Sequence, residues 1–179
     1  MNSDGDVRND LNKQIITLAR KAIEEYTKKG SKISPPEKLP EELKKRRGVF
    51  VSLKKNGNLR GCIGTVEPTQ ENVAQEIIRN AIQACSSDPR FPAITKGELN
   101  DLKISVDILG EKEKIDSIDQ LNPEKYGVFV KKDRQTGLLL PDLEGIDSAE
   151  EQVDIACKKA GIVSKEDIGL YRFEVKRFE

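Results

Sequence analysis

The sequence predicts an α/β protein of the α+β type, with mainly antiparallel sheets flanked by helices and with two ββαβ units. The tetrapeptide GVFV occurs at residues 48–51 and again at 127–130, which is 79 residues further along the chain. In both places a turn, a second strand, a capped helix and a third strand follow in the same order. Two origins fit this repetition: an ancient duplication, or convergence of two hairpins on a common β-rich tetrapeptide.

The first predicted element is an amphipathic helix over residues 9–29. Its apolar residues recur at helical spacing, and Gly30 supplies the stop that often ends a helix. A proline-containing loop then leads to a short helix that Pro40 opens.

The first ββαβ unit begins with a hairpin over residues 48–66. Asn56-Gly57 lies between two alternating runs and predicts a type I′ turn. Thr69 is predicted to cap a helix over 70–86, because an apolar stripe with helical spacing follows it. The alternating run at 102–109 predicts the third strand.

The second unit follows a polar connection over residues 110–125. A hairpin is predicted over 126–143, and Ser148 begins an S-x-x-E capping box for the next helix. That helix is expected to end at Gly161. A single strand over 170–178 is predicted to close the chain.

Composition excludes several classes of function. The 31 basic and 31 acidic residues cancel, and aromatic residues make up only 4% of the chain, which disfavours nucleic-acid binding. The chain has no histidine, so it cannot by itself form a Ser-His-Asp triad, a Cys-His dyad or a His-ligated metal site. Its three cysteines include no C-x-x-C pair, and neither a disulfide framework, a metal site nor a cofactor is predicted.

Targeting signals are also lacking. The first ten residues do not show the basic-then-apolar pattern of a signal peptide, and no apolar run approaches the roughly 18 residues of a membrane span. We therefore expect a cytoplasmic protein that does not enter a membrane. The sequence does not indicate an oligomeric state.

Cys62 lies in the unusual stretch LRGCIG, between two glycines of a predicted strand. A two-residue turn would pair Cys62 with Val51, which favours a small cysteine buried among valines. The functional interpretation makes Cys62 a nucleophile or redox thiol and Arg60 its electrostatic partner or an anion clamp. Gly61 and Gly64 would then let a substrate approach the strand, whereas a β-bulge or close packing of the next helix would also explain them.

The segment DPRF at residues 88–91 is the second unusual cluster. A capped turn anchored by Phe91 is the simpler interpretation. The alternative is that Asp88 pairs with an arginine near Cys62 and that Asp88 and Arg90 complete a substrate pocket. Cys85 and Cys157 continue apolar helical stripes, and both are expected in the core.

These motifs together resemble the AMMECR-type domain family, from about residue 10 to the end of the chain. The resemblance rests on the following segments: RGVFVSLKKNGNLRGCIG, EPT at 67–69, NAIQACSSDPRFP, YGVFV, GLLLP and LYRFEV. In the family, position 126 is often histidine and the proline of GLLLP is often followed by glutamine. Here these positions hold Tyr126 and Asp142, so no histidine-dependent role is expected at that loop.

The resemblance implies a two-lobed α/β fold with a groove between the lobes, the larger lobe containing both chain ends. We expect residues 1–179 to form one such unit, with lobes at 48–110 and at 1–47 plus 120–179. In prokaryotes the family often occurs with a MEMO-like protein and a radical SAM protein, which are the expected partners.

Two functions stay open at this point. In the first, the protein is an enzyme, or a component of an enzyme system, that uses a Cys62/Arg60 site. In the second, it is a non-catalytic binding or adaptor module that recognises a protein partner through the groove between the lobes. The resemblance fixes no reaction, because one fold supports many chemistries.

Overall fold

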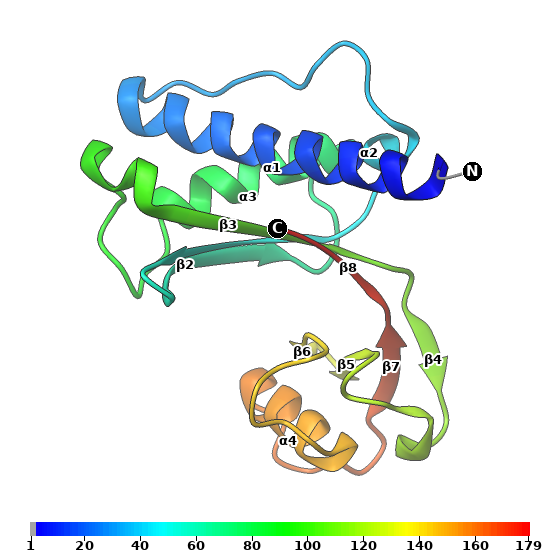
Figure 1. The fold of residues 1–179 in the computed structure, drawn as a ribbon. Coiled ribbons are helices and arrows are strands. Elements are labelled where there is room, and N and C mark those ends of the chain that lie inside the picture. The colour runs from blue at the N-terminus through cyan, green and yellow to red at the C-terminus, as the bar shows by residue number, and fades with distance from the viewer. Residues whose placement is uncertain (1–2) are drawn as a thin grey trace. The chain divides into compact units, whose positions relative to one another are not determined.

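Two four-stranded sheets organise the chain in a computed structural model that describes residues 3–179, with side chains from residue 8 onward (Figure 1). Each sheet lies mainly in its own unit. Unit 1 comprises Met1–Ile108 with Arg177–Glu179, and unit 2 comprises Leu109–Lys176.

Unit 1 is a sheet with helices on one face (Figure 1). The strand order is β2-β1-β3-β8, so β2 is an outer strand. Its elements are α1 (Ser3–Lys29), α2 (Glu41–Lys44), β1 (Val49–Lys55), β2 (Asn58–Thr65), α3 (Val73–Ser86), the 3-10 helix η1 (Lys96–Asp101), β3 (Leu102–Leu109) and β8 (Val175–Phe178).

Alternation along β1 decides which face of this sheet is buried. Val49, Val51 and Leu53 are fully buried in one core with residues of α1 and α3, whereas Phe50 and Ser52 point to the other face. The amphipathic helix that the sequence predicts is therefore confirmed as α1. It ends where expected, since Gly30 has a φ of 71° and donates its N–H to the carbonyl of Tyr26.

The predicted hairpin is present, but its predicted register is wrong. Asn56 and Gly57 have φ angles of 51° and 81°, as a type I′ turn requires. A register shift then falls between Leu53 and Lys54, because Arg60 is an extra residue in β2. Beyond this bulge Cys62 lies opposite Ser52 instead of Val51.

Unit 2 has the strand order β4-β7-β5-β6 and a core built against one helix. Its elements are β4 (Glu113–Ile115), the 3-10 helix η2 (Ile118–Gln120), β5 (Gly127–Lys132), β6 (Gln135–Leu139), α4 (Ala149–Ala160) and β7 (Gly169–Phe173). Ser148 caps α4 through the N–H of Glu151, and Gly161 ends it with a φ of 70°, as predicted.

The two ββαβ units are confirmed, and they share one topology. In unit 1 the hairpin β1-β2, helix α3 and strand β3 give the order β2-β1-β3, with antiparallel pairing throughout. In unit 2 the hairpin β5-β6, helix α4 and strand β7 give the order β6-β5-β7, also antiparallel. Each unit thus places its first strand between its second and third.

Three expectations about elements need correction. Asn72 caps α3 in place of Thr69, and the helix starts at Val73. The single closing strand is two strands, β7 and β8, which belong to different sheets. The polar connection contains the short strand β4, which pairs with β7.

The expected lobes also differ from the observed units. The N-terminal helix was expected with 120–179, whereas α1 packs on α3 and shares the core of the first sheet. Its buried residues Ile15, Ala19 and Ala22 explain this placement, since they need an apolar partner and α3 supplies one.

Candidate functional site

Cys62 lies on the face of the unit 1 sheet that points away from α1 and α3. The bulge at Arg60 produces this orientation, because one extra residue moves the following side chains to the opposite face. Cys62 is therefore partly exposed and not buried among valines. The Ser52 hydroxyl on β1 donates a hydrogen bond to Cys62 Sγ at 3.1 Å.

The DPRF loop holds the peptide groups of Cys62 from the open edge of β2. Asp88 Oδ2 accepts the Cys62 N–H at 2.8 Å, and Arg90 Nη2 donates to the Cys62 carbonyl at 3.2 Å. Arg90 also donates to both Asp88 carboxylate oxygens, from Nε at 3.0 Å and from Nη2 at 2.8 Å. The two side chains together replace the neighbouring strand that an outer strand lacks.

The charge of Asp88 is stabilised by these contacts. Asp88 is only 4% exposed, and the Arg90 guanidinium, with the backbone N–H of Cys62, holds the pKa of its carboxyl well below the usual range. The structure therefore places Asp88 beside an arginine close to Cys62. Arg90 Cζ also lies 5.4 Å from the centre of the Phe91 ring.

Arg60 does not pair with Cys62. Its Nε and Nη2 donate to the two carboxylate oxygens of Glu98 at 3.0 and 3.1 Å, and its remaining contacts are the carbonyls of Pro92 and Ala93. This arginine lowers the pKa of Glu98 to about 2, with help from the backbone of Thr95. Arg60 thus ties β2 to the segment before η1.

The two glycines have neighbours within the protein itself. A Cβ at Gly61 would overlap the backbone carbonyl oxygen of Ala84 on α3, and a Cβ at Gly64 would overlap the Phe50 ring. Close packing of the following helix, one of the explanations that the sequence allows, therefore accounts for Gly61. Neither glycine needs a ligand to explain it.

Known proteins resemble this chain over nearly its whole length. Residues 16–178 match the AMMECR1 family. The chain belongs to the AMMECR1 family. A Thermotoga maritima protein is 51% identical over 167 residues, covering 92% of this chain and 96% of that protein.

One further relative has the same fold, and another is a much longer chain. The crystal structure of the uncharacterised protein PH0010 from Pyrococcus horikoshii matches with a TM-score of 0.84 at 33% identity, covering 94% of this chain and 90% of that one. A Clostridium acetobutylicum protein is 49% identical over 164 residues, yet this chain spans only 35% of its length. In that protein the AMMECR1 domain is thus part of a much longer chain.

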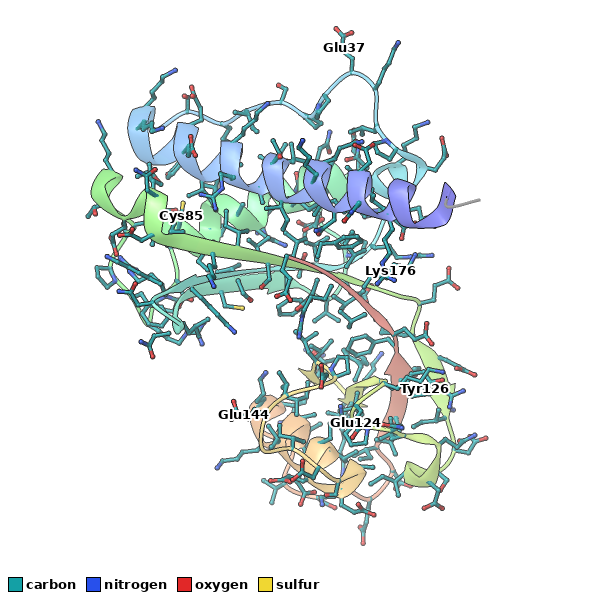
Figure 2. The ribbon with its side chains drawn as sticks, in the orientation of Figure 1. Glu37, Cys85, Glu124, Tyr126, Glu144 and Lys176 are labelled. Carbon is teal, nitrogen blue, oxygen red and sulfur yellow. The ribbon has the colours of Figure 1, made fainter. Side chains whose placement is uncertain are left out.

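The other cysteines of this AMMECR1 domain lie in apolar surroundings, as predicted. Cys85, labelled in Figure 2, is 2% exposed and Cys157 is 3% exposed. Burial raises the pKa of both thiols, because an apolar environment disfavours the thiolate. Among the three cysteines, Cys62 is the accessible one.

Tyr126, where other AMMECR1 proteins were expected to have histidine, lies in unit 2 (Figure 2). Lys125 Nζ and Arg172 Cζ lie 4.8 and 4.6 Å from the centre of its ring. The Tyr126 carbonyl accepts a hydrogen bond from the buried Gln152 at 2.8 Å, which connects this loop to α4.

Sequence reasoning missed two residues of the site, Ser52 and Glu98. The signal for Glu98 was present, because Thr95-x-x-Glu98 has capping-box spacing and the structure contains that box. Ser52 had no comparable signal, since its contact with Cys62 depends on the bulge. Among the side chains of residues 8–179, no group of three or more histidine, cysteine, aspartate or glutamate side chains is arranged to hold a metal ion.

No helix in the described part of the chain is long and apolar enough to cross a bilayer.

Proposed function

We propose that this AMMECR1-family protein is an enzyme, or a component of an enzyme system, in which the Cys62 thiol is the reacting group. The observation that carries the proposal is the combination of access and rigidity at this one cysteine. Its side chain reaches the open face of the sheet, while Asp88 and Arg90 hold its N–H and its carbonyl. A reacting thiol needs both properties.

Two groups take the part beside the sulfur that the sequence assigned to Arg60: the Ser52 hydroxyl, which donates to Cys62 Sγ, and the Arg90 guanidinium, which interacts with the same thiol. Both groups orient the sulfur on the open face of the sheet, and the thiolate is the nucleophilic form of a cysteine. Arg60 then acts as a positioning residue through Glu98, and Asp88 and Arg90 position the Cys62 peptide groups. Substrate contact by Gly61 and Gly64 is not part of this proposal, because α3 and Phe50 occupy the space beside them.

The test is the rate of alkylation of each cysteine by iodoacetamide, measured by mass spectrometry. We expect Cys62 in the folded protein to react at least as fast as in the urea-unfolded chain, and Cys85 and Cys157 to react far more slowly. Accessibility alone would not exceed the unfolded rate. A Cys62 as slow as the other two would overturn the proposal.

Two variants separate an activated thiol from an exposed one. Ser52→Ala removes the hydroxyl beside the sulfur. The loss of this one hydrogen bond should slow Cys62 alkylation several-fold. Ser34→Ala, in the exposed loop after α1, removes a hydroxyl elsewhere and should leave the rate unchanged. Equal rates in the two variants would contradict the role of Ser52.

A second function, binding or adaptor activity, has one observation in its favour. In the Clostridium relative the AMMECR1 domain is joined to a longer chain, and such a link raises the effective concentration of two binding modules for each other. Association with a MEMO-like protein and a radical SAM protein is the specific form of this proposal, and cytoplasmic location goes with it. Co-purification of the three proteins at low salt tests it, and their failure to associate would count against it.

A further inference from the structure

Two lysines lie directly opposite each other on the same face of the sheet as Cys62. Lys54 on β1 and Lys103 on β3 are register partners, and both side chains are exposed. Neither forms an ion pair with a carboxylate of residues 8–179, whose side chains the structure describes. Like charges directly opposite in a sheet destabilise it, so this pair calls for an explanation.

The register places these lysines next to Cys62. The adjacent pair on the same face is Ser52 and Ser105, and Ser52 is also the partner of Cys62 on β2. Lys54 is two residues, about 7 Å, from Ser52 along β1 and is therefore diagonal to Cys62 on the neighbouring strand, while Lys103 lies one strand further away. Lysine side chains are long enough to bring both ammonium groups towards the thiol. The open face therefore has two ammonium groups, two hydroxyls and one thiol within a small area.

A cleft of about 600 Å³ opens at the lysine end of this area. The cleft straddles the edge of β3: Lys54, Lys103 and Ser105 line it from the open face, whereas Leu102, Ile104 and the α1 residues Ile16 and Arg20 line it from the core face. Glu179 also lines it and contributes a carboxyl group. Arg20 is occupied, since it donates to the carbonyls of Leu99 and Leu102. The two lysines are therefore the cations in this cleft that are available to a ligand.

Acidic groups near the lysines do not form ion pairs with them. Glu179, which lines the cleft, is held through its backbone by Asn12 on α1. Asp107 is the acidic residue further along β3, and both of its oxygens accept hydrogen bonds from Arg177. Arg60 and Lys55 both donate hydrogen bonds to Glu98, and the Lys55 side chain points to the core face of the sheet. Lysines often protect an exposed strand edge, but Lys54 lies on β1, which has a neighbour on each side.

We propose that Lys54 and Lys103 bind the phosphate or carboxylate group of a small-molecule ligand beside Cys62. Two ammonium groups held at cross-strand distance suit an anion that neutralises both. The binding site is inferred from the geometry of the sheet alone. Its role in a reaction rests on the proposed function of Cys62. The ligand is thus an anionic small molecule whose charged group lies one residue pair away from the thiol.

Titration of the full chain with inorganic phosphate, and separately with acetate, tests the site by ¹H–¹⁵N NMR. We expect saturable shifts of the amides of Ser52–Lys55 and Lys103–Ser105, with the stronger ligand identifying the preferred anion. Lys54→Gln and Lys103→Gln should each weaken binding about five-fold, as expected for the loss of one nearby charge. Lys21→Gln on α1 makes the same change of net charge and should have no effect.

Absence of saturable shifts, or equal affinities in all three variants, would overturn the proposal. A second measurement keeps this outcome apart from the failure of the proposed function. Anionic iodoacetate and neutral iodoacetamide are compared at Cys62, and we expect Lys54→Gln to lower the ratio of the two rates. If phosphate binds but Cys62 is inert, only the thiol chemistry is refuted. If Cys62 is reactive but no anion binds and the ratio of rates does not change, only the anion site is refuted.

Discussion

Asp88 accepts the backbone N–H of Cys62 at 2.8 Å while its own charge is balanced by Arg90. This contact joins the loop after α3 to the outer strand that contains the thiol. The free edge of an outer strand is prone to pair with other chains. Asp88 and Arg90 occupy the hydrogen-bonding groups of this edge at Cys62. The hydrogen bond from the Cys62 N–H to Asp88 therefore fixes the backbone at Cys62 whether or not the thiol reacts.

The first prediction concerns the stability that Asp88 contributes. Asp88→Asn should lower the free energy of unfolding by roughly 2 to 3 kcal/mol, because it removes a buried charge and leaves Arg90 without its partner. Urea unfolding at neutral pH measures this. The matched control is Asp101→Asn at the exposed end of η1, which should change the value by less than about 0.5 kcal/mol. Similar effects of the two substitutions would contradict the role of the contact.

A second prediction concerns acid stability and depends on Glu98. The Arg60 guanidinium lowers its pKa to about 2, against 4.5 for a free glutamate, and its side chain is 15% exposed. A carboxyl group with a lowered pKa stabilises the fold fully above the unfolded value, and this contribution disappears as the pH falls towards the folded value. The free energy of unfolding should therefore fall between about pH 4.5 and pH 2, with Asp88 contributing in the same direction.

Glu98→Gln provides the comparison for that pH profile. Glutamine is uncharged, so the variant should be less stable than the parent at pH 6. Because glutamine does not titrate, the variant should also lose less free energy of unfolding on acidification, by roughly 1 to 3 kcal/mol. Urea midpoints at pH 6, 4 and 3 give both slopes. Parallel slopes in the variant and the parent would show that Glu98 does not stabilise the folded state through its charge.

Local patterns in the sequence predicted most of the fold. The Asn56-Gly57 turn, the stop at Gly30 and the cap at Ser148 each depend on a few neighbouring residues, and each is present. The order of elements along the chain in the two ββαβ units followed from repetition of these patterns. Such features are encoded locally, and a single sequence is enough to find them.

Features that depend on one inserted residue or on distant contacts could not be predicted. Arg60 forms a bulge, and that one residue moves Cys62 from the core face to the open face. Thr69 shows a second limit, because Glu76 on α3 accepts hydrogen bonds from its N–H at 2.7 Å and its hydroxyl at 2.9 Å. Glu76 is fully buried, and its carboxylate binds Thr69 from inside α3, so Thr69 does not occupy the cap position that the sequence assigned to it.

The last prediction explains why a glycine precedes Cys62. Gly61→Ala would place a methyl group against the carbonyl oxygen of Ala84, a backbone atom of α3 that cannot move without the helix. We expect a loss of roughly 2 to 3 kcal/mol in the free energy of unfolding. The second hairpin has the same arrangement, since a Cβ at Gly137 would overlap the carbonyl oxygen of Ala156 on α4. Repetition of this contact in both units indicates a requirement of helix packing.

Gly97→Ala is the matched control for this prediction. A Cβ at Gly97 meets nothing within 4 Å, and the residue is not in the left-handed region. That substitution should be neutral or stabilise the fold by up to about 1 kcal/mol, because it restricts the unfolded chain. Urea unfolding of both variants gives the comparison. If Gly61→Ala were tolerated as well as Gly97→Ala, helix packing would not be the reason for the glycine, and close approach of a ligand to β2 would again need to be considered.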